Sequence, residues 1–103
     1  MPKSSAPDET ARLRQNAWMG DAVLELYVRT WVLEHHGVVD AEMKRRFTCN
    51  QFLNCLGNPT QVEADIGVIY QREGLTAAFE WIRTRLEPLF LKQESKRARR
   101  PSA

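Results

Sequence analysis

The chain has 103 residues, of which 43% are hydrophobic and 27% charged, as is usual for one globular domain. A domain of this length buries only about two-thirds of its unfolded surface, so its core is modest. No apolar run reaches the ~20 residues that cross a bilayer, and the first ten residues lack the apolar stretch of a secretory signal. We therefore expect no membrane partner, and a location in the cytoplasm or in an organelle interior.

Charge is unevenly distributed along the chain. The formal net charge is +2, but residues 92–103 hold five basic residues and one acidic residue. The other residues carry ten basic and twelve acidic side chains, so the body is near neutral and the end is basic. Basic ends of this kind bind nucleic acid phosphates or simply stay solvated, and both interpretations are open here. We expect a disordered lead at residues 1–9, a helical domain at 10–91 and a basic tail at 92–103.

The first predicted helix runs from about Thr10 to His36 and ends at Gly37, a natural C-cap. A second helix begins after Asp40, and a short third one, within "NQFLNCLG", stops at Gly57. The two cysteines lie six positions apart around this third helix, which fits neither a CxxC redox pair nor a zinc knuckle. We expect them to be reduced thiols.

A fourth helix is predicted to begin with Asn58 as N-cap and Pro59 at the first helical position, and to end at Gly74. The last predicted helix starts at Leu75 and shows apolar residues at i, i+3, i+4, i+7 and i+11, until Pro88 disturbs it. Since no segment alternates like a strand, the predicted fold class is all-α.

The first helix combines an apolar surface with two acids. Residues 17–33 are apolar around nearly the whole helical circumference, which is typical of a central helix. One narrow polar stripe remains, formed by Arg14, Asp21, Glu25 and Arg29. Carboxylates at i and i+4 repel one another, and burial makes this worse. Either the two arginines pair with the acids, or a divalent cation lies over the stripe.

The fourth helix offers a second acid in a similar setting. Val62, Ile66, Ile69 and Tyr70 share one face, and Gln61, Asp65 and Arg72 the opposite, solvated one. Glu63 falls among the apolar residues beside Gly67, just as Gly20 precedes Asp21. Small residues let helix backbones approach, and converging carboxylates with open positions suit Mg²⁺. Plain ion pairing remains the alternative.

Two segments resemble motifs of the ribonuclease III family, and most closely those of Mini-ribonuclease III. "MGDAVLELYVR" (19–29) is similar to the signature helix of the family, and "VEADIGVIYQREGLTAAFEWI" (62–82) to its second motif. Together they cover about a third of the chain, in the order that the family uses. The resemblance implies a ribonuclease III-like helical domain that cleaves structured or double-stranded RNA, with rRNA maturation as the expected role.

The resemblance also implies site residues and partners. Asp21 and Glu63 would be the catalytic residues and the ligands of Mg²⁺ or Mn²⁺. The first helix would form a homodimer, or a heterodimer with another protein of this fold. The implied interface residues are Trp18, Met19, Ala22, Val23, Tyr27 and Trp31.

RNA contacts are expected from two basic segments. The first is "MKRRF", with Lys44, Arg45 and Arg46, which could equally be a solvated helix face. The second is the basic end, with Lys96, Arg97, Arg99 and Arg100.

The chain also departs from the family. Ala17 and Thr60 stand where full-length relatives have further acids, although Mini-ribonuclease III is similar in having small or hydroxyl residues there. Only 42 residues separate Asp21 from Glu63, fewer than the family normally uses. These departures favour an alternative function, that of a catalytically inactive, RNA-binding structural subunit, for example of an organellar ribosome. A helical dimerisation module without RNA is a third hypothesis; the enzyme is the preferred one.

Overall fold

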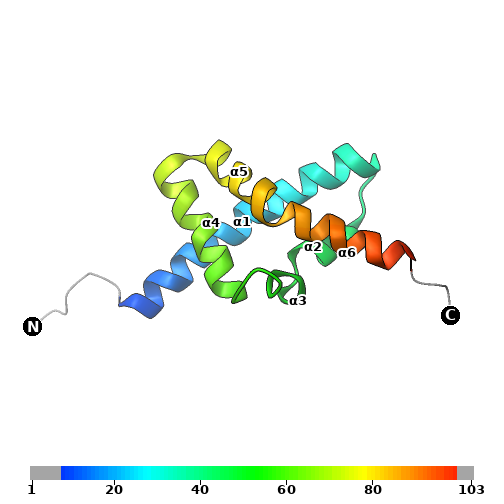
Figure 1. Ribbon diagram of the computed structural model, residues 1–103. Coiled ribbons are helices and arrows are strands. Elements are labelled where there is room, and N and C mark those ends of the chain that lie inside the picture. The colour runs from blue at the N-terminus through cyan, green and yellow to red at the C-terminus, as the bar shows by residue number, and fades with distance from the viewer. Residues whose placement is uncertain (1–7, 100–103) are drawn as a thin grey trace, which may run out of the picture.

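A computed structural model describes residues 8–99, and helices are the regular secondary structure of this part of the chain (Figure 1). The helices are α1 (Glu9–His36), α2 (Ala41–Thr48), α3 (Asn50–Leu53), α4 (Pro59–Glu73), α5 (Leu75–Arg85) and α6 (Glu87–Arg99). The predicted all-α class is therefore confirmed for the described residues. No helix among them is long and apolar enough to cross a membrane.

Local signals in the sequence set most helix ends. Gly37 ends α1 with φ 83°, a left-handed conformation that glycine adopts without steric cost. Asp40 caps α2 and Asn58 caps α4, each accepting a hydrogen bond from a backbone N–H of the first turn. Pro59 occupies the first position of α4, where its missing N–H costs nothing. The predicted bounds of α1 and α4 are thus confirmed to within a residue.

The first helix begins within the predicted N-terminal lead of residues 1–9. Asp8 is the N-cap of α1, and its side chain accepts a hydrogen bond from the backbone N of Ala11 at 2.7 Å. Glu9 is already helical. The rest of the predicted lead, residues 1–7, lies outside the described residues.

The hydrophobic core forms around α1, which packs most extensively against α4 and also against α2 and α5 (Figure 1). A group of aromatic rings fills the end of the core near α2, α3 and α6. Phe47 stacks on Phe90 with ring centroids 4.3 Å apart, and Phe52 meets both rings edge-on. All three side chains are almost completely buried, which stabilises the fold by about 1.5–3 kcal/mol each.

One face of α1 is not covered within the single chain. Trp18 is 78% exposed, and Ala22, Leu26 and Leu33 on the same side of the helix are also exposed. The predicted central position of this helix therefore holds for the faces that pack against α2, α4 and α5, and not for this one. An apolar helical wheel does not show which apolar side chains find a partner.

The C-terminal part differs from the prediction of one last helix followed by a tail. The chain bends at Leu86, and Pro88 sits in the first turn of a new helix, where proline is tolerated. Residues 92–99 are helical and belong to α6. Arg46 of α2 binds Glu94 of α6 through two hydrogen bonds of 3.0 and 2.9 Å, which fix this helix to the body.

Candidate metal centre at the crossing of α1 and α4

Two glycines allow α1 and α4 to cross with their backbones in contact. A Cβ atom added to Gly20 would lie 1.7 Å from the carbonyl oxygen of Glu63, and one added to Gly67 would lie 1.9 Å from that of Asn16. These distances are far below any van der Waals contact, so both positions require glycine at this helix separation. On the same crossing, the Gln71 side-chain amide donates a hydrogen bond to Asn16 Oδ1 at 3.1 Å.

The close crossing brings together the two acids that the sequence singled out. Asp21 follows Gly20 on α1 and is exposed, whereas Glu63 on α4 is half-buried. The two carboxyl groups are close enough for a hydrogen bond between them. Burial raises the pKa of the Glu63 carboxyl to about 7, and the hydrogen bond and negative charge of Asp21 act in the same direction. The crossing therefore holds two neighbouring carboxyl groups, and the one on Glu63 resists ionisation because of its burial and the charge of Asp21.

A pair of carboxylates open to solvent on one side fits a hard divalent cation. Mg²⁺ is commonly bound through one or two carboxylates, with water and substrate phosphates completing its shell. Two further positions contribute no acid: Ala17 is buried at the crossing and Thr60 is exposed at the start of α4. Within residues 8–99, no group of three or more histidine, cysteine or acidic side chains could hold a metal ion. Any cation here would thus depend on Asp21 and Glu63, with its other ligands from water or substrate.

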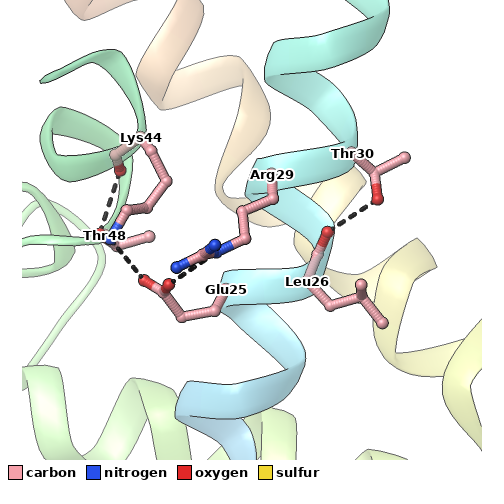
Figure 2. A network of polar contacts seen from close by, with 6 residues as sticks. All are labelled: Glu25, Leu26, Arg29, Thr30, Lys44 and Thr48. Atoms are coloured by element: carbon pink, nitrogen blue, oxygen red, sulfur yellow. Dashed lines mark hydrogen bonds and ion pairs between the residues drawn. The ribbon is translucent and has the colours of Figure 1, made fainter. Parts of the chain in front are cut away.

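Glu25, the other acid of the α1 stripe, takes part in a separate network. Its carboxylate accepts a hydrogen bond from Arg29 at 3.2 Å and one from Lys44 of α2 at 3.2 Å (Figure 2). The alternative of arginine pairing therefore holds for Glu25 and Arg29, and Lys44 adds a cation that the wheel did not reveal. Arg14 is exposed and forms no ion pair with any residue between 8 and 99.

The basic residues expected to contact RNA have different surroundings. In "MKRRF", each cation has an acidic partner: Lys44 binds Glu25, Arg45 binds Glu42 and Arg46 binds Glu94. The Arg46 side chain is only 19% exposed, so it acts as a link between helices. Lys96, Arg97 and Arg99 are exposed on α6, and Arg100 lies outside the described residues.

The residues expected at a dimer interface divide into two groups. Trp18 and Ala22 are exposed and Met19 is partly exposed, so these three are accessible to a partner. Val23, Tyr27 and Trp31 belong to the core of the single chain, where they are at least nine-tenths buried. Tyr27 also donates a hydrogen bond to Glu87, which ties α1 to α6. The apolar character of these three is therefore explained without a partner.

The comparisons with known proteins do not extend this picture. No protein-family model matches the chain, and neither curated proteins nor solved structures gave a match. The functional interpretation therefore depends on the two motifs and on the arrangement of their acids.

Proposed function

We propose that this protein is a divalent-cation-dependent endoribonuclease of the ribonuclease III type that cleaves structured or double-stranded RNA. The observation that supports it best is the meeting of Asp21 and Glu63, which lie 42 positions apart, at a helix crossing that two glycines make possible. An acid pair that repels itself weakens the fold unless a cation compensates it. Binding of a catalytic cation would explain why the chain has two acids at a position where they weaken the fold.

The surroundings of each acid suit different tasks at a metal centre. Asp21 is exposed, so its carboxylate is accessible to a cation and to a substrate phosphate. Glu63 is half-buried on α4, and burial raises the pKa of its carboxyl to about 7, so a bound cation would favour the ionised form that a metal ligand needs. A Mg²⁺ or Mn²⁺ ion bound there would supply the positive charge that activates water and stabilises the phosphodiester transition state.

A dimer through α1 is part of the proposal. The exposed face of this helix carries Trp18, Ala22 and Leu26 beside the charged Arg29, and it borders Asp21. A second copy packed there would bury this face and place two acid pairs in one particle, suited to the two strands of a duplex. A partner of the same fold but different sequence would serve equally well.

A non-catalytic role is the second candidate, and one observation favours it. The described residues hold only two carboxylates at the site, with Ala17 and Thr60 where more acids would strengthen metal binding. In that case the fold acts as an RNA-binding structural subunit, for example of a ribosome.

Cleavage of a long duplex RNA distinguishes the two candidates. We expect the purified protein to cut it with Mg²⁺ and not with EDTA, and Asp21→Asn to abolish cutting. Asp65→Asn is the matched control, because Asp65 is exposed on α4 and its side chain accepts a hydrogen bond from Gln61. If the folded wild-type protein leaves several structured RNAs intact, the nuclease proposal is wrong.

A further inference from the structure

A groove of about 570 Å³ lies between α6 and the α2–α3 segment. Four basic residues line it: Arg46 from α2, and Lys92, Lys96 and Arg97 from α6. Phe52 and Leu89 provide apolar parts of its wall. In Figure 1, α6 extends past α2 and α3 at the end of the molecule away from the crossing of α1 with α4. The groove is therefore a second concave feature, separate from the acid pair.

The positive charge of this groove is only partly compensated. Arg46 is neutralised by Glu94, and this ion pair joins the two walls and so fixes their separation. Lys92, Lys96 and Arg97 are exposed and have no carboxylate partner among residues 8–99. Three uncompensated cations on one helix repel each other, so the groove favours an anionic occupant.

The cations are arranged along a line rather than around a point. Lys92 and Lys96, which line the groove, are one helical turn apart on the same side of α6, and Arg99, which is not among the lining residues, continues the stripe at i+7. The stripe is thus about 10 Å long, at 1.5 Å per residue. A row of phosphates matches such a stripe better than a single small anion does, because each phosphate can pair with its own cation.

We propose that this groove binds the phosphodiester backbone of an RNA strand, as a contact distinct from the acid pair. The choice of RNA among polyanions rests on the proposed function, whereas the prediction of a phosphate-binding groove rests on the charges alone. Lys92 thereby joins Lys96, Arg97 and Arg99 as an RNA contact. The binding energy comes mainly from counterion release, so it falls steeply with salt.

The two cysteines of the chain provide a direct test, because both line this groove. Cys55 is exposed and Cys49 is half-buried. The rate at which a maleimide alkylates Cys55 therefore reports whether the groove is occupied, and no cysteine has to be introduced for the assay. With a short duplex RNA in low salt and EDTA, we expect alkylation to slow by about fivefold or more, and the protection to disappear as the salt concentration rises.

Charge reversal shows whether the stripe is responsible. We expect Lys92→Glu combined with Lys96→Glu to abolish the protection and to weaken RNA binding by about tenfold or more, with a shallower salt dependence. The matched control is Arg12→Glu combined with Arg72→Glu, two exposed residues on α1 and α4 with the same charge change. If the lysine variant does not fold, as judged by its helical circular dichroism, the glutamine versions of both changes replace it.

The outcomes separate this proposal from the nuclease proposal. All binding is measured with Asp21→Asn in EDTA, so protection of Cys55 supports the groove even if the wild-type protein never cuts RNA. If the control variant with Arg12→Glu and Arg72→Glu loses as much RNA binding as the lysine variant, the proposed RNA contact in the groove is wrong. It is also overturned if inorganic phosphate or anionic lipid vesicles protect Cys55 at the same phosphate concentration while RNA does not.

Discussion

Replacing Glu63 with glutamine should stabilise the fold at alkaline pH. The pKa of this carboxyl is raised from 4.5 to about 7, first by burial and then by its hydrogen bond to Asp21 and the charge of that residue. The folded protein therefore keeps a proton that the unfolded chain releases between pH 4.5 and 7. The stability contributed by the protonated acid is fully present below about pH 4.5, and it is lost as the pH rises to 7. The neutral glutamine avoids this loss.

The magnitude follows from the size of the shift. The difference of about 2.5 pH units corresponds to an upper limit of about 3 kcal/mol, at 1.36 kcal/mol per unit. Solvent reaches this carboxyl beside the exposed Asp21, and screening reduces the expected effect to about 1–2 kcal/mol. For a domain of this size, such a gain raises Tm by about 5 °C or more.

Urea and thermal unfolding, followed by circular dichroism without divalent cations, measure this effect. We expect Glu63→Gln to resemble the wild-type protein at pH 5 and to exceed it in stability at pH 8. Glu80→Gln is the control, because Glu80 is exposed and bound to Arg83, which holds its pKa below the usual range, so no gain is expected. A Glu63→Gln protein that gains no stability between pH 5 and pH 8 would refute the idea that an uncompensated acid pair lies at the crossing.

Two further substitutions test how the helices are held together. Gly20→Ala should destabilise the fold by about 3 kcal/mol, because the added Cβ cannot fit against the backbone of α4. Gly57→Ala is the control and should cost little, because the nearest atom to its added Cβ lies at 3.8 Å. Chemical denaturation compares the two variants, and equal losses of stability would contradict the close crossing. Glu94→Gln should cost about 1–2 kcal/mol, because it leaves the mostly buried Arg46 without its carboxylate. Hydrogen exchange should speed up first in α6, and an equal increase in all helices would argue against this link.

Helix ends were predictable because their signals are local. Gly37 and Gly74 stop helices, and Asn58 with Pro59 starts one, through interactions within a few residues of the end. An interruption at Pro88 was predicted, but the new helix that begins there was not, since a proline that would break a helix interior is tolerated in a first turn. As a result, residues 92–99 were expected as a tail, and the groove beside them went unseen.

The candidate site was predictable in its residues and less so in its surroundings. The helical wheel placed Glu63 among the apolar residues of α4, whereas the structure leaves it half-buried, and the glycines beside both acids indicated a close crossing. Asp21 was expected on a buried face but is exposed. The pairing of Lys44 with Glu25 joins residues of different helices, and no periodicity within one helix can reveal such a contact.

The central claim is that Asp21 and Glu63 together hold one divalent cation. Titration with Mn²⁺ at pH 8, followed by electron paramagnetic resonance, measures this without any RNA substrate. We expect one bound ion per chain, lost in Asp21→Asn and in Glu63→Gln and retained in Asp65→Asn. Binding that is absent from the folded wild-type protein, or equal in all four proteins, would contradict it.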